Sequence, residues 1–556
     1  MLCIPADRQV FLIRGTATCY RNYRSHEDVS GESAMYDVVI IGYGPTGMLA
    51  ATKLGRAGVK VAVVERYKSL YMLPRVGIVH DDIMRMFQEI GINEKVKPAT
   101  EFLPIYEMVN GDKLLLSNNV EPYAAHGWPE FISIYQPAFE AELDNVAKHL
   151  PSVEVFQGEK AVGLTQDKDK VTVTVETDDG VKRNIEGRYL IAADGGNSFA
   201  RPALGIDYEF LGFDQDWLVI DAKIKRPKAN MPPLRQFCEP GQPGMTMQMG
   251  AHHRRWSFMI FEGETIEHAM KPENVWKRLN RPEGGTQEDF ELIRVASYKF
   301  TSQLAKSWQV GRVFLAGDAA HLMPPFLAQG MCTGLRDAYN ISWKLELVVK
   351  GLAGENILKS YETERSPNAR ATIIESARVG QNVVERDLAK AAARDAQLLA
   401  MQAELLKAKG AKPLIAFRVP GFTDGVIAKA GPKVHGAGDV FPQGKVKNGN
   451  AEGAFDDIAG RGFLIVARND HPASALSPED LAFWTSIGGK VVRFDTRPGT
   501  GGLTDVEGRY SKLMDEYGCD VIVKRPDYYI FGACPTVKDL PALIADLRMQ
   551  LQQGLH

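Results

Sequence analysis

The sequence has few cysteines, no long apolar run and almost no net charge, and each shortage excludes a class of protein. Its 6 cysteines are widely separated and form no CxxC pair, which argues against a disulfide scaffold, a zinc site or a dithiol redox centre. It contains no uninterrupted apolar stretch of about 18 residues, the length that a membrane-spanning helix needs. Lysine and arginine number 66 against 69 acidic residues, so no basic field exists to hold nucleic acid or an anionic membrane.

The remaining composition is typical of a large globular protein with small-molecule partners. The chain has 556 residues, of which 45% are hydrophobic and 24% charged, enough for about three domains. Residues 1–34 carry arginines but no apolar core of a secretory signal, so we expect a disordered N-terminal extension and a folded body that starts near Met35. The scattered cysteines suit a reducing compartment, and we expect a cytoplasmic location.

The first motif is a glycine turn between a strand and a helix. A β-branched run at residues 37–41 leads into a GxGxxG turn that contains Gly42, Gly44 and Gly47, and a helix and a second strand ending in Glu65 follow. Gly42 permits the tight turn, Gly44 lets backbone approach a pyrophosphate, and Gly47 lets the helix pack closely on the strand. Glu65 is placed to accept hydrogen bonds from a ribose diol.

A glycine turn alone often has a purely structural role, but the complete strand, turn, helix, strand and acid unit predicts a dinucleotide site. This unit by itself leaves FAD and NAD open. The sequence contains no second glycine-rich unit of this kind, so a nicotinamide nucleotide would bind without a Rossmann domain of its own.

Two distant segments repeat the pattern of a strand that ends at an aspartate. Residues 189–193 form a predicted strand that leads into Asp194-Gly195, and residues 312–316 form another that leads into Gly317-Asp318. Either aspartate could merely cap a turn or a helix. Together, in this order after the glycine turn, they favour a bound nucleotide, because an acceptor carboxylate suits a polyol.

With all three signatures in this order, the sequence resembles the single-component (class A) FAD-dependent aromatic monooxygenases over residues 36–550. Residues 315–330 and 336–345 look most like the 3-(3-hydroxyphenyl)propionate hydroxylases. The resemblance implies an α/β fold: an FAD-binding Rossmann-like domain of the GR2 type, an interleaved β-sheet substrate domain and a C-terminal thioredoxin-like domain. One departure is Cys332, where many relatives carry asparagine, and we interpret it as a small buried residue.

The resemblance also implies the residues that contact FAD. Asp318 would bind the ribityl hydroxyls, Asp194 would serve FAD and the passing nicotinamide, and the backbone of residues 325–331 would lie beside the pyrophosphate and isoalloxazine. Arg75 and Gln136 match further flavin contacts, although they could be a surface charge and a loop residue. The full predicted set is Gly42, Gly44, Pro45, Thr46, Gly47, Glu65, Arg66, Arg75, Gln136, Asp194, Asp318, Pro325, Gly330 and Met331, with no metal site.

The implied reaction consumes NADH or NADPH and O2 and hydroxylates a small phenolic compound through a flavin C4a-hydroperoxide. A substrate like 3-(3-hydroxyphenyl)propionate is expected, with resorcinol, a hydroxypyridine or a polyketide as alternatives, and a non-catalytic flavin-binding protein as another. His80 is the candidate proton acceptor, because imidazole titrates near neutral pH, although it could simply begin a helix. A serine hydrolase is disfavoured, because the near-match to GxSxG around Ser198 fails at Ala200.

We predict a monooxygenase domain at residues 35–435, with a substrate sheet at about 205–300 and long helices at about 357–409. A connector and the thioredoxin-like domain follow at residues 436–556, with predicted strands that include residues 528–531. Since this unit has no CxxC pair, we expect it to provide stability or a homodimer contact rather than disulfide chemistry.

Overall fold

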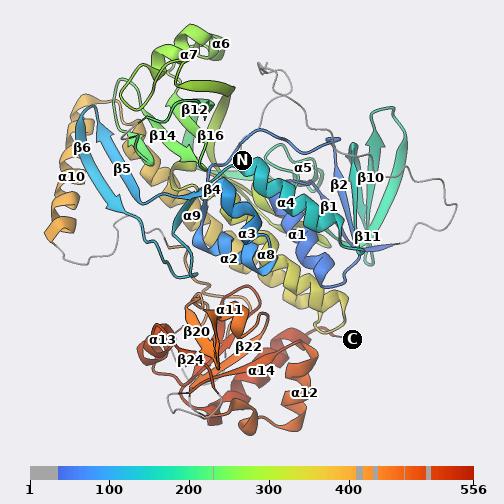
Figure 1. The fold of residues 1–556 in the computed structure, drawn as a ribbon. Helices are drawn as coiled ribbons and strands as arrows, with labels where there is room; N and C mark the ends of the chain where they lie inside the picture. Colours follow the sequence, from blue (N-terminus) through green and yellow to red (C-terminus); the bar gives the residue numbers. More distant parts are fainter. Residues whose placement is uncertain are drawn as a thin grey trace.

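The computed structural model describes residues 35–228, 231–407, 418–429, 436–468, 470–495 and 502–555. Figure 1 shows a large body, coloured from blue to light orange, with a smaller C-terminal unit of helices and strands below it. The predicted N-terminal extension lies outside the described residues.

A mixed sheet carries the predicted glycine turn. Its main path runs β17 (Gln309–Val310), β18 (Val313–Leu315), β11 (Lys182–Ala192), β1 (Tyr36–Ile41), β2 (Val61–Glu65) and β8 (Val153–Gln157), and β9 (Glu159–Gln166) and β10 (Val171–Thr177) extend it beside β11. From β18 to β8 neighbouring strands are parallel. Helices α1 (Pro45–Arg56) and α8 (Gly330–Val349) pack against each other. The predicted strand, turn, helix and strand unit is therefore confirmed.

A second sheet interleaves early and late parts of the chain. Its order is β19 (His321–Leu322), β16 (Phe290–Ala305), β12 (Tyr208–Ile224), β15 (His253–Met259), β14 (Gly244–Met249), β13 (Leu234–Phe237), β5 (Ile105–Asn110) and β6 (Lys113–Asn119). The strands are rich in aromatic and methionine residues, which pack well on a half-buried pleated surface. The substrate sheet predicted at about 205–300 matches its central strands.

Short elements connect the two sheets. The small sheet contains β3 (Ile78–His80), β7 (Phe131–Ile134) and β4 (Thr100–Phe102). The helices of this body are α2 (Asp81–Glu89), α3 (Asn93–Val96), α4 (Gln136–Lys148), α5 (Ala200–Ala203), α6 (Ile266–Met270), α7 (Pro272–Leu279), α9 (Ser360–Val384) and α10 (Leu388–Lys407), with 3-10 turns η1 (Lys97–Ala99), η2 (Gly317–Ala319), η3 (Pro325–Leu327) and η4 (Glu355–Lys359). The long helices predicted at about 357–409 correspond to α9 and α10.

The C-terminal unit is built on a four-stranded sheet. Parallel β22 (Leu464–Arg468) and β23 (Lys490–Phe494) are followed by antiparallel β25 (Val521–Lys524) and β26 (Ile530–Cys534), in the order β23-β22-β25-β26. The other elements are β20 (Lys445–Asn448), β21 (Ala451–Ala454), β24 (Thr504–Asp505), α11 (Phe455–Ile458), α12 (Pro478–Ser486), α13 (Arg509–Tyr517), α14 (Leu540–Gln552), η5 (Pro472–Ala475) and η6 (Val537–Asp539). This topology is compatible with the predicted thioredoxin-like domain, which stays a prediction, as do the domain boundaries.

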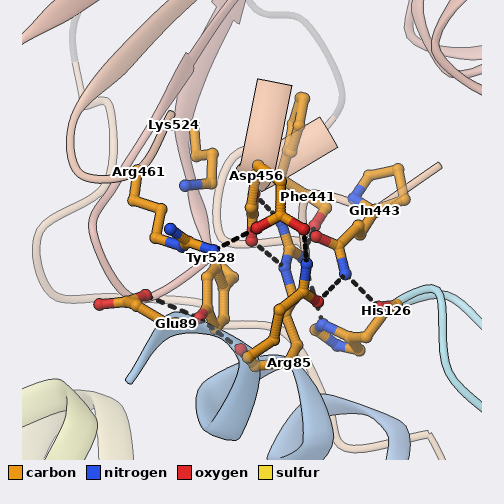
Figure 2. Close-up of polar contacts among 12 residues, drawn as sticks. Arg85, Glu89, His126, Phe441, Gln443, Asp456, Arg461, Lys524 and Tyr528 are labelled. Carbon is orange, nitrogen blue, oxygen red and sulfur yellow. Dashed lines mark hydrogen bonds and ion pairs between the residues drawn. The ribbon is translucent and has the colours of Figure 1, made fainter. Parts of the chain in front are cut away.

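A buried polar network joins α2 to the C-terminal unit (Figure 2). The Arg85 guanidinium donates to both carboxylate oxygens of Asp456 at 2.7 and 2.9 Å and to the Phe441 carbonyl oxygen at 2.7 Å. The Tyr528 hydroxyl, from the other side, donates to Glu89 at 2.8 Å. Because Arg85 and Asp456 are both buried, each charge needs the other to offset its loss of hydration. This specific ion pair holds the two parts of the chain together.

Candidate functional site

Three predicted segments meet at one cavity of about 290 Å³, here called the larger cavity. They are the glycine turn after β1, the Asp194 segment after β11 and the Asp318 turn after β18. Since these strands are parallel neighbours, their carboxyl ends lie at the same edge of the sheet, where α/β folds bind nucleotides. The predicted contacts that line this cavity are Gly42, Gly44, Pro45, Thr46, Glu65, Arg66, Arg75, Asp194, Asp318 and Met331.

The glycine turn has the shape that a pyrophosphate needs. Gly42 has φ +100°, and a Cβ there would lie 2.3 Å from the Ala193 carbonyl oxygen, so only glycine fits. A Cβ on Gly44 would meet nothing within 4 Å, which leaves open space beside the start of α1. No side chain caps that helix, so its first N–H groups are available to an anion. Gly47 lies behind the turn, where a Cβ would approach the Gly42 oxygen to 2.0 Å.

Glu65 forms the far rim of the larger cavity at the end of β2. Its Oε2 accepts a hydrogen bond from the Tyr43 backbone N–H at 2.8 Å, and its Oε1 accepts one from Tyr67 N–H at 2.9 Å. A carboxylate has about four lone-pair sites, so these two contacts leave room for a ribose diol. The same contacts hold the glycine turn against β2.

Asp194 caps a helix with one carboxylate oxygen and leaves the other without a partner among the described residues. Its Oδ2 accepts from the backbone N–H groups of Phe199 at 2.7 Å and Ala200 at 3.0 Å, and so caps α5. Its Oδ1 is buried and has no hydrogen-bond partner among the described residues, although Asp194 lines the larger cavity. Burial raises the pKa of this carboxyl. An orphaned acceptor at this edge fits a nucleotide hydroxyl or a nicotinamide amide.

Asp318 lies in the tight turn η2. Side chains from two other elements form hydrogen bonds with the backbone of this turn. The Tyr208 hydroxyl donates to the Asp318 carbonyl oxygen at 2.9 Å, and Asp337 accepts from the Gly317 N–H at 3.0 Å. Gly317 has φ +61°, and a Cβ there would press on the Thr46 hydroxyl at 2.8 Å. The turn therefore packs on α1 and presents Asp318 to the larger cavity.

Arg75 lies between the larger cavity and a second cavity, and lines both. Gln136 lines neither. Its Oε1 accepts from the backbone N–H groups of Arg75 at 2.8 Å and Val76 at 2.6 Å, so it fixes the loop that carries Arg75. The Arg75 side chain pairs with Glu140 at 2.7 Å and is not a free surface charge.

The second cavity, here called the smaller cavity, has a volume of about 110 Å³ and adjoins the larger one. Its wall is one face of the second sheet, because Gln236, Met245, Ser257 and Val219 are successive partners across β13, β14, β15 and β12. Aromatic and methionine side chains dominate the lining. The remaining lining includes Tyr106, Phe131, Leu234, Met247, Tyr298, Phe300, Met323, Phe326 and Leu327, together with the predicted loop residues Pro325, Gly330 and Met331.

Arg255 supplies positive charge to the smaller cavity but is already paired. It donates to both oxygens of Asp221 at 2.6 and 2.9 Å, and its Nη1 donates to the Arg75 carbonyl oxygen at 2.6 Å. This guanidinium therefore stabilises the Arg75 loop from the sheet side. Tyr106 and Gln236 each have a buried polar atom without a hydrogen-bond partner among the described residues, and no sequence motif points to either residue.

The loop before α8 separates the smaller cavity from His80. The His80 Nε2 lies 3.1 Å from the Leu327 carbonyl oxygen and 3.0 Å from the Gln329 side-chain nitrogen, and His80 lines neither cavity. Burial, with the nearby Arg336 charge, lowers the pKa of His80 to about 4. The imidazole is consequently neutral near pH 7, and its contact with substrate would pass through Leu327. Ala328 in this loop has φ 54°, which is uncommon for a residue other than glycine.

Two further expectations concern single residues. Cys332 is fully buried, and burial raises the pKa of its thiol to about 12, which agrees with a small buried residue and not with a reactive thiolate. The Ser198 hydroxyl accepts from the Arg201 backbone N–H at 3.0 Å, so it caps the first turn of α5. This local role agrees with the failure of the hydrolase motif.

Among the described residues, no helix is both long and apolar enough to cross a membrane.

A nucleotide-binding edge with two adjoining cavities defines a flavoprotein of the single-dinucleotide-fold class, and comparisons with known families agree. Residues 35–376 match the family model of the FAD binding domain, and residues 438–550 match that of the HcaD C-terminal domain. The chain belongs to the FAD-dependent aromatic monooxygenases. It is an enzyme of that family, with FAD as its cofactor and a nicotinamide nucleotide as its reductant.

Similar proteins have closely related names. A probable NADH-specific resorcinol 4-hydroxylase of Rhodococcus jostii (strain RHA1) is 37% identical over 519 residues, 92% of this chain and 94% of the relative. A 3-(3-hydroxy-phenyl)propionate/3-hydroxycinnamic acid hydroxylase of Mycobacterium sp. (strain JLS) is 32% identical over 523 residues, 90% of this chain and 89% of the relative.

Solved structures share the fold at lower identity. The flavin-dependent monooxygenase PieE, solved with FAD and substrate, matches with a TM-score of 0.79 and 20% identity over 94% of this chain and 100% of its own. Aklavinone-11 hydroxylase with FAD and aklavinone matches with a TM-score of 0.72 and 19% identity over 92% of this chain and 98% of its own.

Proposed function

We propose that this enzyme uses NADH and O2 to hydroxylate a small uncharged phenol of the resorcinol type, bound in the smaller cavity. The observation that carries the proposal is the pairing of both guanidinium groups in the lining, Arg75 with Glu140 and Arg255 with Asp221. A substrate carboxylate would have to compete with these carboxylates for positive charge. A neutral ring needs no such partner and suits the apolar wall.

One similar protein supports the same choice. The relative at 37% identity is named for resorcinol and NADH, and it covers nearly the whole chain. The limited volume of the smaller cavity, about 110 Å³, also favours a compact ring.

A substrate of the 3-(3-hydroxyphenyl)propionate type is the second candidate. It is supported by the relatives at about 32% identity. It is also supported by Arg75, whose Nε is buried without a hydrogen-bond partner among the described residues and could meet a carboxylate at the junction of the two cavities.

The proposed roles of the larger cavity's residues follow from their geometry. The Gly42–Gly47 turn and the start of α1 would hold the pyrophosphate of FAD, Glu65 would hold the ribose, and Asp318 would hold the ribityl chain. The uncapped start of α8, at Gly330, would face the isoalloxazine with its positive end. When bound, FAD supplies the activation of O2 and the transfer of one oxygen atom.

The protein's own contribution is to orient the ring and exclude water. The sheet wall buries the aromatic substrate, and the Pro325–Met331 loop separates it from His80. We propose that His80 acts on turnover through its contacts with Leu327 and Gln329. The predicted homodimer, with contacts through the C-terminal unit, and the predicted cytoplasmic location are retained as proposals.

The direct test is anaerobic reduction of the FAD-loaded enzyme by NADH and by NADPH. The rate of reduction is measured as the loss of flavin absorbance. Each reductant is tested alone and with resorcinol, phenol or 3-(3-hydroxyphenyl)propionate. We expect resorcinol to accelerate reduction by NADH most strongly. Acceleration only by the carboxylated phenol would overturn the substrate proposal in favour of the second candidate. A flavin that no phenol affects would contradict both.

A further inference from the structure

Three residues that line the smaller cavity have a buried polar atom without a hydrogen-bond partner among the described residues: Arg75 Nε, at the junction with the larger cavity, the Tyr106 hydroxyl and the Gln236 amide oxygen. Tyr106 and Gln236 lie on the sheet wall. Tyr106 is 2% exposed and Gln236 1% exposed, so bulk water does not satisfy them. Buried polar groups are nearly always hydrogen-bonded, because an unmet donor or acceptor destabilises the folded protein. Two such groups on a wall made mostly of aromatic and methionine side chains indicate a ligand that completes them.

The sheet register brings these two residues together. Parallel strands β5 and β13 place Tyr106 opposite Leu234, and Gln236 lies two residues farther along β13. Alternate residues of a strand share a face, so Leu234 and Gln236 point to the same side, and the lining of the smaller cavity includes both along with Tyr106. Tyr106 and Gln236 therefore face the same cavity from neighbouring strands.

The hydrogen-bonding capacity of each group is fixed by its surroundings. The Gln236 Nε2 donates to the Phe326 carbonyl oxygen at 3.3 Å, which leaves Oε1 as the amide atom that can accept from a ligand. The Tyr106 side chain is fully buried, and burial raises its pKa well above the ordinary range, so its hydroxyl stays protonated and can donate. Gln236 thus offers one acceptor and Tyr106 one donor.

We propose that Gln236 and Tyr106 recognise the two oxygen substituents of a dihydroxylated ring, with Gln236 accepting the hydrogen of one hydroxyl and Tyr106 donating to the other oxygen. The inference rests on the proposed function for the identity of the ring. It explains specificity, because a ring without oxygen substituents would leave both buried groups unpaired, whereas Met245, Met247 and Phe300 offer only apolar contact.

The test uses FAD-loaded enzyme and three rings of similar shape, namely resorcinol, 3-methoxyphenol and 1,3-dimethoxybenzene. Binding is followed by the change in flavin absorbance for the wild type, Tyr106→Phe and Gln236→Met. We expect each variant to lose about 5- to 10-fold in affinity for resorcinol, the effect of one lost hydrogen bond. Tyr106→Phe should also weaken both methoxy rings, because an ether oxygen still accepts from Tyr106, whereas Gln236→Met should leave the dimethoxy ring, which has no donor, unchanged. Gln236→Met should also weaken 3-methoxyphenol, which keeps one donor.

Thr52→Val is the matched control, because Thr52 on α1 has a buried hydroxyl without a partner among the described residues but lines neither cavity. Its binding should equal that of the wild type. Ligand-free Tyr106→Phe should melt at or above the wild-type temperature, since the orphaned hydroxyl is gone. If Gln236→Met loses FAD or melts early, Tyr106→Phe alone decides the result.

The inference is overturned if both variants bind resorcinol as the wild type does, or if Gln236→Met weakens the dimethoxy ring as much as it weakens resorcinol. It is also overturned if the wild type binds only 3-(3-hydroxyphenyl)propionate, because the ligand then lacks the second ring oxygen. A wild type that takes up FAD but binds no phenol defeats the proposed function itself. A wild type that binds resorcinol while the variants are unaffected defeats only the pairing of Tyr106 and Gln236.

Discussion

His80 and Gln329 are joined by a 3.0 Å contact between their Nε2 atoms, which connects β3 to the loop before α8. Arg336 on α8 donates to the Gln329 amide oxygen at 2.7 Å and is paired with Asp82 on α2. The His80 ring also reaches the carbonyl oxygen of Leu327, a residue of the smaller cavity. The loop that forms one wall of the smaller cavity is therefore held from behind by an uncharged imidazole and a buried ion pair.

The low pKa of His80 predicts a pH dependence of stability. The folded-state pKa is about 4, whereas the pKa in the unfolded chain is about 6.5. Between these values the unfolded chain binds the extra proton, so stability falls as the pH is lowered from about 6.5 to about 4. The free energy of unfolding of the wild type should therefore fall between about pH 6.5 and pH 4. In His80→Gln, which has no imidazole to protonate, this fall should be smaller by about 1 to 3 kcal/mol. Urea unfolding at about pH 7 and pH 4.5 measures the difference, and equal losses would refute the prediction.

Replacing glycine by alanine should have different effects at two positions of the glycine turn. Gly44→Ala adds a methyl group to open space, so the FAD-free protein should keep its melting temperature while FAD affinity falls by about 10-fold or more. Gly42→Ala forces a contact with Ala193 at a positive φ and should destabilise the FAD-free protein by about 2 kcal/mol or more. Calorimetry without FAD and fluorescence titration with FAD separate the two. Identical behaviour of the variants would contradict this assignment.

A side chain added at Gly77 should change the shape of the smaller cavity. A Cβ there would lie 2.2 Å from the terminal methyl group of Met247, which lines the cavity and has a flexible side chain. Gly77→Ala should displace Met247, lower kcat/KM for the phenol by about 10-fold and leave FAD content unchanged. Gly241→Ala, where a Cβ meets nothing within 4 Å, is the control. Wild-type kinetics in Gly77→Ala would argue against a substrate at this wall.

The Arg85 and Asp456 pair predicts that the two units unfold as one. Asp456→Asn leaves the buried Arg85 charge without its partner and should destabilise the protein by about 3 to 5 kcal/mol. The exposed pair of Lys68 and Asp178 supplies the control, since Asp178→Asn should change stability by less than about 1 kcal/mol. Calorimetry should show a separate early transition of the C-terminal unit only in Asp456→Asn. A single unshifted transition would show that the pair does not couple the units.

Much of the nucleotide edge could be predicted because its signals are local. Gly42, Asp194 and Asp318 each lie within three residues of the end of a strand, and parallel pairing of these strands brings their ends together without further information. Gln136 and Gly47 were grouped with the contacts, but the structure places them behind the turn and the loop that they hold. Neighbouring positions in a motif thus divide into lining and supporting residues only in three dimensions.

The smaller cavity could not be predicted at the level of residues, because its wall depends on register between distant strands. Tyr106 and Gln236 meet through β5 and β13, and no periodic pattern links the two segments. The strand predicted at residues 528–531 begins later, at Ile530, because Tyr528 has φ 69° and cannot continue an extended strand. Tertiary contacts of Tyr528 with Glu89 and Tyr339 accompany this backbone conformation.

The most direct measurement of the central claim is the source of the oxygen in the product. The FAD-loaded enzyme is supplied with NADH, resorcinol and ¹⁸O2 in ordinary water, and the hydroxylated ring is analysed by mass spectrometry. The account predicts one ¹⁸O atom in each product molecule. Product that carries oxygen only from water, or NADH oxidation with no hydroxylated ring from any phenol, would contradict it.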